Sequence, residues 1–394
     1  MSTPSNPVQA NQVQLFAADK AAQAALRNAA ITQILNINSQ TIYPTSQNVL
    51  NITPRNVGII KRFWVEITGT ITNTHATDTA TLTDIGLANI LSNVTFYDLN
   101  NNLRINTSGV HLSLLSALKR RRPLGGTAQY NTADGNNVST MFNVGPATWG
   151  VFQAPATIAA NGGTGNYRAD FEVPLEYDNS DMRGAVFANV VNSTMNLQLT
   201  LNQNPISAAG SDETFAVYSG ATGTHTNSTI TVYQEHYDQF NVANLPTIAL
   251  STVYELKAST FKGMTPAQDF PMAFANFRDF LSVCSIYNNS GSSGGRANGS
   301  DINTWALTTA NYTNIFKYGP LTSALLTQNH LSDGLPAGTY YFDFRQKPIW
   351  TTQYGNTELV VNPSTAGANA YAYTMWEALA LQNTLVGGAS LAAG

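Results

Sequence analysis

The sequence has 394 residues, a formal net charge of −4 at pH 7, and charged side chains at only 11% of positions. An average soluble protein is about 25% charged, and nucleic-acid-binding proteins are usually basic, so the surface as a whole is not a nucleic-acid-binding surface. Asn, Thr, Ser and Gln must supply the polar surface. That composition suits close packing against copies of the same chain, and it also suits a secreted β-protein. The single cysteine, Cys284, excludes an intrachain disulfide.

Residues 9–37 are rich in Ala, Gln and Leu and contain neither Gly nor Pro. Ala22, Leu26 and Ile34 recur at about 3.6-residue spacing, which predicts one amphipathic helix with a weak, mostly alanine face. Two interpretations stay open: the helix packs on its own domain or a neighbour, or it lies beside lipid. In the second case the membrane-proximal residues are Leu15, Phe16, Lys20 and Arg27. No apolar run approaches the length of a membrane span, and the polar N-terminus lacks the layout of a signal peptide.

From residue 41 onward the hydrophobic period changes to two. The alternation covers residues 63–71, 167–175, 195–201 and 371–381. This pattern is typical of antiparallel sheets that turn one face toward a core, as in a β-sandwich. Long loops rich in Gly, Asn and Ser lie at residues 125–163, 203–228 and 285–303. Loops of that length usually contact something outside the domain.

Four consecutive basic residues, Lys119, Arg120, Arg121 and Arg122, stand out in this weakly charged chain. One interpretation is a solvated or interface loop that pairs with Asp or Glu. A second is an inward patch facing anionic lipid headgroups, where each Lys or Arg contributes roughly 1 kcal/mol. A third is direct contact with a genome. The residues alone do not decide between them.

Two short sequences are repeated in the same order in the two halves of the chain. GNYRADFEVPL begins at Gly165 and GTYYFDFRQKPI begins at Gly338, with Gly, Tyr, Asp and Phe at the same offsets. A weaker similarity links the segments that begin at Thr53 and Thr265. The repetition predicts two similar β-domains in tandem, with a boundary near residues 244–257.

No pattern for catalysis, cofactor binding or metal binding is present. The five histidines form neither a His-x-His nor a His-Glu-x-x-His arrangement. Ser293 occupies the centre of a Gly-x-Ser-x-Gly match, but no helical pattern follows it, as a nucleophile elbow requires. The predictions are therefore no enzyme activity, no catalytic residue, no cofactor and no metal site.

Residues 53–98 resemble the opening of the first jelly roll in the major capsid proteins of tectiviruses, which are tailless icosahedral phages with an internal membrane. The similarity continues through TSGVHL (107–112), APATIAA (154–160), GAVFANV (184–190), TVYQEHYDQF (231–240), LSTVYEL (250–256) and KPIWTTQYGNTELVVNP (347–363). It covers nearly the whole chain in the correct order. The family offers no counterpart for the basic run, so the resemblance assigns that run no role.

The resemblance implies an all-β fold of two tandem eight-stranded jelly-roll β-sandwiches with an N-terminal α-helix. The expected divisions are an N-terminal helix or arm (1–40), a first jelly roll (41–245), a second jelly roll (246–385) and a flexible C-terminal arm (386–394).

The implied function is that of a major capsid protein. Three chains would form a homotrimer with a pseudo-hexagonal outline, and the trimers would tile an icosahedral shell. The implied partners are neighbouring trimers, penton or vertex and minor capsid proteins, and the internal membrane through the N-terminal helix. Direct nucleic-acid binding is not expected. The implied location is the virion, after assembly in the cytoplasm of a bacterial host.

Two other functions compete with the structural one. A carbohydrate-binding or receptor-binding β-sandwich would group aromatic residues on its loops, whereas Trp149, Trp305 and Trp350 are scattered. A hydrolase on a jelly-roll scaffold would need a constellation of carboxylate, histidine and serine residues that the sequence lacks. Fold alone does not separate these functions, because jelly rolls occur in capsids and in lectins.

Overall fold

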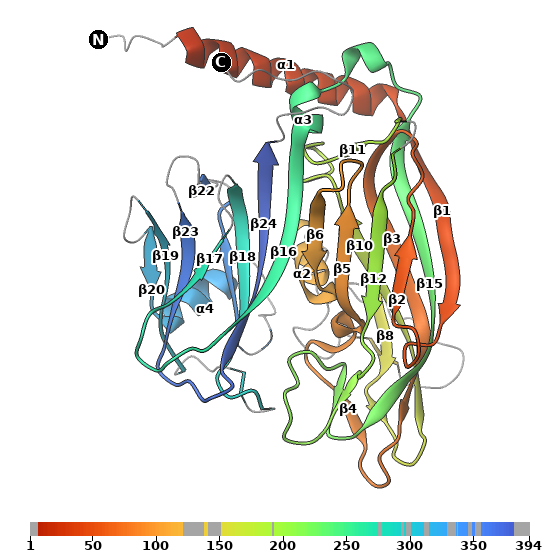
Figure 1. Ribbon diagram of the computed structural model, residues 1–394, viewed down its shortest axis with the longest axis vertical. Coiled ribbons are helices and arrows are strands. Elements are labelled where there is room, and N and C mark those ends of the chain that lie inside the picture. The colour runs from red at the N-terminus through yellow and green to blue at the C-terminus, as the bar shows by residue number, and fades with distance from the viewer. Residues whose placement is uncertain are drawn as a thin grey trace.

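Two β-sandwiches stand side by side beneath a long helix (Figure 1). The computed structural model describes residues 7–120, 138–140, 151–190, 193–274, 278–292, 295–296, 301–310, 315–328, 336, 338–345, 349–350 and 356–381. The fold is mostly β, with one long helix, α1 (Pro7–Ala29), laid across one end of the molecule.

The prediction of one helix over residues 9–37 is wrong beyond Ala29, where α1 ends. Strand β1 (Ile31–Ile42) follows at once and pairs in antiparallel fashion with β15 (Gly223–Asp238). The segment from Ile31 onward carries β-branched Ile and Thr together with Asn and Ser, which favour strands or compete with helical hydrogen bonds. Ile34 therefore lies on a strand and is 59% exposed, rather than on the apolar face of the helix.

The first jelly roll is built from two facing sheets. Its strands are β1, β2 (Val49–Ile52), β3 (Ile59–Asn73), β5 (Leu91–Tyr97), β6 (Leu103–Thr107), β10 (Thr164–Pro174), β12 (Asn196–Leu201) and β15. One sheet has the order β1-β15-β3-β10, and the facing strands have the order β2-β12-β5-β6. Shorter elements extend this unit: β4 (Ala80–Leu82), η1 (Gly86–Ile90), α2 (Gly109–Arg120), β7 (Val138–Thr140), β8 (Val151–Pro155), β9 (Thr157–Ile158), β11 (Val186–Phe187), β13 (Ile206–Ser207), β14 (Tyr218–Ser219) and η3 (Val242–Asn244).

The second jelly roll repeats this arrangement. Its elements are α3 (Thr247–Ser251), β16 (Thr252–Lys262), β17 (Phe270–Ala273), β18 (Asp279–Asn288), β19 (Ile302–Thr309), β20 (Phe316–Tyr318), α4 (Pro320–Gln328), β21 (Thr339–Asp343), β22 (Ile349–Trp350), β23 (Thr357–Pro363) and β24 (Tyr371–Leu381). The order β16-β24-β18-β21 matches β1-β15-β3-β10, and β17-β23-β19-β20 matches β2-β12-β5-β6. The repeated sequences fall on equivalent strands. The sequence that begins at Gly165 lies on β10 and the one that begins at Gly338 contains β21, while the weaker pair leads into β3 and β18.

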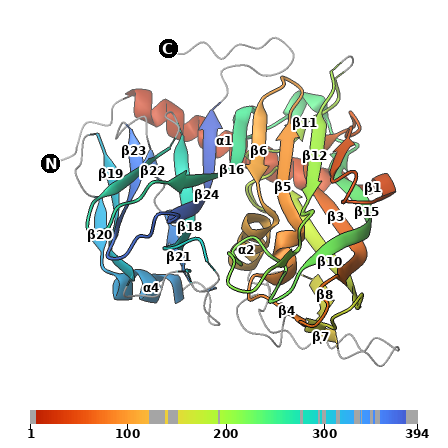
Figure 2. The ribbon, with the colours of Figure 1, turned by 60° about the horizontal axis from the view of Figure 1, so that its bottom comes forward.

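One sheet runs through both jelly rolls without a break. Strand β6 of the first roll pairs in parallel with β16 of the second, through Ile105 with Leu256 and Asn106 with Lys257. The resulting nine-stranded sheet has the order β2-β12-β5-β6-β16-β24-β18-β21, with β22 paired to β18. Figure 2 shows the two sandwiches meeting along this seam.

The hydrophobic core also crosses the seam. The large cluster of the first roll includes Tyr254 and Leu256 of β16 and Met375 of β24, all fully buried. Helix α2 contributes buried Val110, Leu112, Leu114 and Leu115 to the same cluster. The second roll has a separate core of its own around Trp305. The two rolls are thus one packed body.

We expect Met375→Ala to destabilise both jelly rolls together. The substitution removes buried atoms from the shared core, which costs about 2–5 kcal/mol for this kind of change. Because the core is continuous, calorimetry of the purified chain should show one transition at a lower temperature than in the wild type. Met272→Ala removes the same atoms from the second roll's own core and is the matched comparison. If the first roll of the Met375→Ala variant still unfolded at the wild-type temperature, the shared core would be contradicted.

Candidate functional site: the N-terminal helix and a charged cavity of the first jelly roll

Helix α1 is fixed to the rest of the molecule by polar residues. The carboxylate of Asp19 accepts hydrogen bonds from the backbone N–H groups of Ile248, at 2.9 Å, and Ala249, at 3.2 Å. The first N–H groups of any helix have no acceptor within that helix, and Asp19 supplies one for those of α3. Gln23 donates to Asp19 at 2.9 Å and accepts from the backbone N–H of Met182 at 3.0 Å.

One face of α1 carries these contacts. Asp19, Gln23 and Leu26 follow helical spacing and are all buried. Leu26 packs with Ile59 and Leu250, among others, in a small cluster at this end of the molecule. Sequence reasoning selected Leu26 but missed Asp19 and Gln23, because polar residues on a buried face look like surface residues until their remote partners are known.

The four residues predicted to lie near a membrane do not share one environment. Leu15 is 60% exposed and Lys20 is exposed. Arg27 is half-buried and donates from Nη1 to the backbone carbonyl of Asn179 at 3.4 Å. Phe16 lies within α1. No described helix is both long enough and apolar enough to cross a membrane.

The basic run begins at the end of α2. Lys119 and Arg120 are the last residues of this helix, whereas Arg121 and Arg122 lie outside the described residues. The preceding turns of α2 line a cavity of 360 Å³ in the first roll. The remaining lining residues come from β3, β10 and the segment that follows β10.

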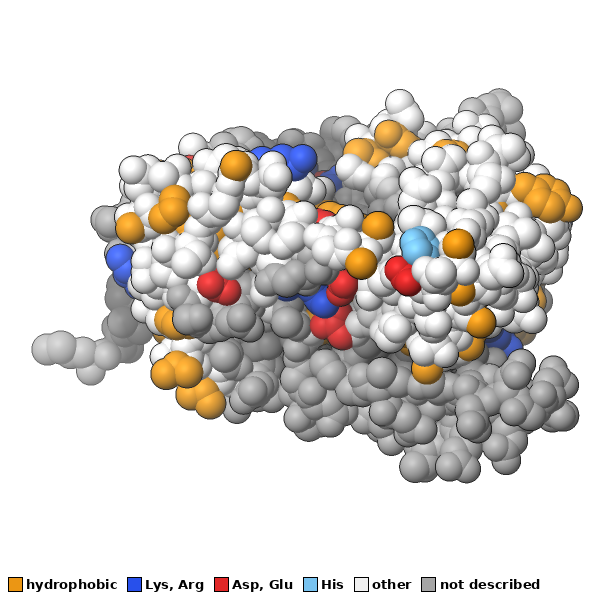
Figure 3. Space-filling view, turned by 90° about the horizontal axis from the view of Figure 1, so that it is seen from below, with side chains coloured by type: hydrophobic (Ala, Val, Ile, Leu, Met, Phe, Trp, Pro, Cys, Tyr) orange, Lys and Arg blue, Asp and Glu red, His pale blue; other side chains and the backbone are white. Residues whose placement is uncertain are grey.

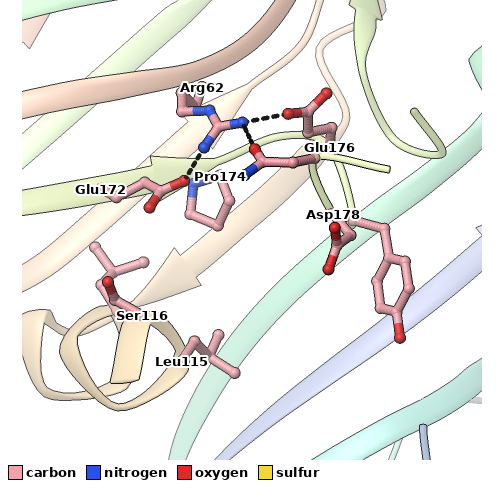
Figure 4. A pocket seen from close by; sticks show the side chains of 10 residues that line it. Arg62, Leu115, Ser116, Glu172, Pro174, Glu176 and Asp178 are labelled. Atoms are coloured by element: carbon pink, nitrogen blue, oxygen red, sulfur yellow. Dashed lines mark hydrogen bonds and ion pairs between the residues drawn. The ribbon is translucent and has the colours of Figure 1, made fainter. Parts of the chain in front are cut away.

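Ion pairs dominate the far wall of this cavity (Figure 4). The guanidinium of Arg62 donates to Glu172 at 2.8 Å and also to Glu176 and the side-chain oxygen of Asn179. Arg62 and Glu176 are each only 2% exposed. Asp178 lines the same cavity.

A neighbouring pair extends the charged cluster. Lys61 donates to Glu235 at 2.6 Å, and the indole N–H of Trp64 donates to the same carboxylate at 2.8 Å. Lys61 also lies 4.0 Å from Glu176. Among the described residues, Arg62 and Lys61 are the cations that the salt-bridge geometry places against the carboxylates of residues 172, 176 and 235.

The pKa of Glu176 is raised although two cations lie close to it. Burial is the largest influence and raises its pKa to about 7, against the lowering effect of Arg62 and Lys61. Burial also acts on Glu235, but there the hydrogen bond from Lys61 and the charge of Arg62 prevail and lower the pKa.

Among the described residues, histidines and metal ligands form no comparable site. His225 is fully buried, with Nε2 2.5 Å from the Tyr167 hydroxyl and 2.6 Å from that of Ser228, and burial lowers its pKa to about 4. Within the described ranges, no group of three His, Cys, Asp or Glu residues is placed to hold a metal ion. Ser293 lies outside the described residues.

The end of the molecule opposite α1 has a mostly uncharged polar surface (Figure 3). Charged side chains gather near the middle of this face, between the two lobes. The guanidinium of Arg296, in the second roll, lies 2.6 Å from the carboxylate of Asp84 in the first. This ion pair adds a second link across the seam.

We expect Glu176→Gln to change how stability depends on pH. The folded state holds a proton on Glu176 up to about pH 7, whereas the unfolded chain releases it near pH 4.5. The contribution of this group is therefore full below pH 4.5 and is lost as the pH rises through 7. Denaturant unfolding at pH 5 and pH 8 should show that Glu176→Gln loses less stability with rising pH than the wild type.

Glu235→Gln is the matched control for this prediction. It makes the same chemical change in the same cluster, but at a carboxylate whose pKa is lowered, so it should reduce stability at pH 8. Identical pH profiles for Glu176→Gln and the wild type would show that Glu176 stays ionised.

The chain matches two family models along most of its length. Residues 4–240 match "P3 major capsid protein N-terminal" and residues 251–393 match "P3 major capsid protein C-terminal". It is 37% identical over 381 residues to "Major capsid protein P3" of Enterobacteria phage PRD1, a tectivirus, covering 93% of this chain and 92% of that protein. The predicted resemblance to tectivirus capsid proteins is confirmed.

Solved structures confirm the double jelly-roll fold. The atomic structure of Sulfolobus Turreted Icosahedral Virus contains a chain with a TM-score of 0.61 at 12% identity, covering 89% of this chain and 91% of that one. PBCV-1 VP54, fitted into a reconstruction of the virophage Sputnik, gives a TM-score of 0.54 at 11% identity, with 88% and 93% covered. The chain belongs to the P3 major capsid protein family, and it is a structural subunit of a capsid shell rather than an enzyme.

Proposed function

We propose that three copies of this chain assemble into a pseudo-hexagonal capsomer that tiles the icosahedral shell of a membrane-containing phage. The observation that carries the proposal is the repetition of one jelly-roll topology twice in a chain, with the two rolls side by side. Three such chains place six similar units around one axis. Family membership supports the same assembly.

In the proposed shell, each segment of the chain has its own role. The proposed parts are the helix or arm (1–40), the first roll (41–245), the second roll (246–385) and a C-terminal arm (386–394), the last of which lies outside the described residues. Strand β1 joins the arm to the first roll, because it forms the edge of that roll's sheet. The arms and long loops would contact neighbouring trimers and the vertex and minor capsid proteins, after assembly in the host cytoplasm.

The end that carries α1 is proposed to face the internal membrane. Leu15 and Lys20 are exposed there, as an interfacial helix requires of its apolar and basic residues. Arg27 instead holds the helix to the segment after β10. In this assignment the membrane lies between the shell and the genome, so direct contact with the genome is not part of the proposed function.

We expect the purified chain to be a trimer. One chain weighs 42.3 kDa, so light scattering after size-exclusion chromatography should give a mass of about 127 kDa. Because subunits of an obligate assembly unfold together, the thermal transition should move to higher temperature as protein concentration rises. A chain that stays monomeric at high concentration would contradict the assembly.

Lys20→Glu should weaken the binding of the protein to vesicles that contain anionic phospholipid. A basic residue near such a surface contributes about 1 kcal/mol, so each chain should lose roughly fivefold or more in affinity at low salt. Lys262→Glu makes the same change at an exposed lysine of β16, at the end of that strand away from α1, and should leave binding unchanged. Equal losses in both variants would contradict the orientation.

The same vesicle assay tests the basic run. If the run faces lipid, replacing Arg120, Arg121 and Arg122 by Gln should lower binding at low salt and leave the trimer mass unchanged. Unchanged binding would assign the run to a loop or interface role instead.

A further inference from the structure

The charged cavity of the first roll has the form of a small-molecule site. Its inner wall contains Arg62, Glu172 and Glu176, all of which are buried. Its rim includes the partly exposed Asp178 and the exposed Asn179. The volume of 360 Å³ falls within the range of roughly 300–1,000 Å³ that is typical of ligand sites. We propose that the cavity binds a linear aliphatic diamine as a dication, with one ammonium group at Glu176 and the other at Asp178.

One buried carboxylate oxygen of the inner wall lacks a hydrogen-bond partner. Glu176 is 2% exposed, and its Oε1 accepts from the guanidinium of Arg62. No donor among the described residues reaches Oε2, the second oxygen of this carboxylate. Buried polar atoms in folded proteins normally have a partner, because an unpaired one has lost its hydration without compensation. A bound ammonium group would supply that partner, since it carries three N–H donors and no acceptor.

The spacing of the acidic groups favours two separate ammonium groups over one metal ion. Figure 4 shows Glu172 and Asp178 well apart, on either side of the Arg62–Glu176 pair. Within the described part of the chain, no three His, Cys, Asp or Glu side chains are close enough together to hold a metal ion. A diamine can contact two carboxylates that lie apart, because its own methylene chain separates its charges. Each contact would be a charge-assisted hydrogen bond.

Apolar side chains supply the rest of the cavity wall. Leu112 and Leu115 come from α2, and Pro174 is the last residue of β10. The methylene groups of a diamine would lose contact with water against these side chains, as the aliphatic stem of a lysine does when only its ammonium group stays polar. A hydrated inorganic cation would gain nothing from this wall. The combination of acidic and apolar groups therefore favours an organic cation.

In the free protein a proton on Glu176 takes the place of the ammonium group. Burial raises the pKa of this carboxyl to about 7, although Arg62 and Lys61 of β3 lie close to it. The neighbouring strands β10 and β15 add the carboxylates of Glu172 and Glu235. An ammonium group beside Oε2 favours the ionised form, so the ligand and the proton exclude each other.

This exclusion fixes how the affinity depends on pH. A carboxyl with a pKa of about 7 is about 9% ionised at pH 6 and about 91% ionised at pH 8. Alkylammonium groups stay charged at both pH values. The affinity for a diamine should therefore rise about tenfold from pH 6 to pH 8.

The ligand would act on the segment that holds α1. Residues 174–179 line the cavity, and the same segment accepts the hydrogen bond from Arg27 at the backbone carbonyl of Asn179. A ligand that binds only the folded protein stabilises it by mass action, so an occupied cavity should strengthen this docking surface. The cavity lies within one chain, and the inference does not depend on the proposed trimer.

Isothermal titration calorimetry of the purified full chain with putrescine tests the site. We expect saturable binding of one putrescine per chain at pH 8, and about tenfold weaker binding at pH 6. Butylamine has the same carbon chain with one ammonium group, so it should bind about tenfold or more weakly, for lack of one charge-assisted hydrogen bond. No binding of putrescine at pH 8, or binding that Mg²⁺ abolishes at equal ionic strength, would overturn the inference.

Glu176→Gln removes the inner contact while it keeps the shape of the side chain and an oxygen for Arg62. It should weaken putrescine binding about tenfold or more at pH 8 and make the affinity independent of pH. Glu358→Gln makes the same change on β23 of the second roll, away from the cavity, and should alter neither property. Equal losses in both variants would show that putrescine responds only to net charge, and would overturn the site.

Asp178→Asn tests the rim contact and does not require a change in the buried wall. Asp178 is partly exposed, and an asparagine can still accept the hydrogen bonds that Ser180 donates to Oδ1. The variant should bind putrescine and butylamine with similar affinity, because only the contact at Glu176 remains. A variant that prefers putrescine as strongly as the wild type does would contradict the two-point contact. The mass in solution should be the same for all these variants, which separates this test from that of the trimer.

Discussion

The parallel pairing of β6 with β16 is the constraint on which the rest of the structure depends. It joins two jelly rolls into one nine-stranded sheet and sets their relative orientation. Apolar residues of α2 are buried along this seam, and the Arg296–Asp84 ion pair spans it at the far end. A shell subunit needs this rigidity, because a change in the angle between its rolls would prevent regular tiling.

The charged cluster around Arg62 shows how this weakly charged chain uses its few ionic groups. Burying a charge costs several kcal/mol unless partners surround it, and a buried ion pair rarely adds net stability. Its contribution is specificity: Arg62 can satisfy Glu172 and Glu176 only when β3 and β10 are in register and the segment after β10 is in place. The cluster thereby fixes the surface on which α1 docks, through Asn179 and Met182.

The sequence predicts strands better than it predicts partners. Alternation located β3, β10, β12 and β24, because one face of each strand is buried. The end of α1 was missed because Ile34 fits both a helical and a strand period, and pairing with β15 decides between them. Asp19 and Arg62 were missed for a different reason: each is a polar residue whose role depends on partners distant in the sequence.

One further property follows from carrying two rolls in a single chain. If the rolls repeat around one axis, the same kind of junction is encoded twice, once inside the chain and once between chains. The internal copy can be mostly apolar, as Leu114 and Leu256 are, because it never separates from its partner. The external copy must remain soluble before assembly, which limits how much apolar surface it can expose. Helix α4, which follows β20 as α2 follows β6, accordingly combines its exposed Leu321 and Leu325 with threonine, serine and glutamine, whereas the described side chains of α2 are mostly buried.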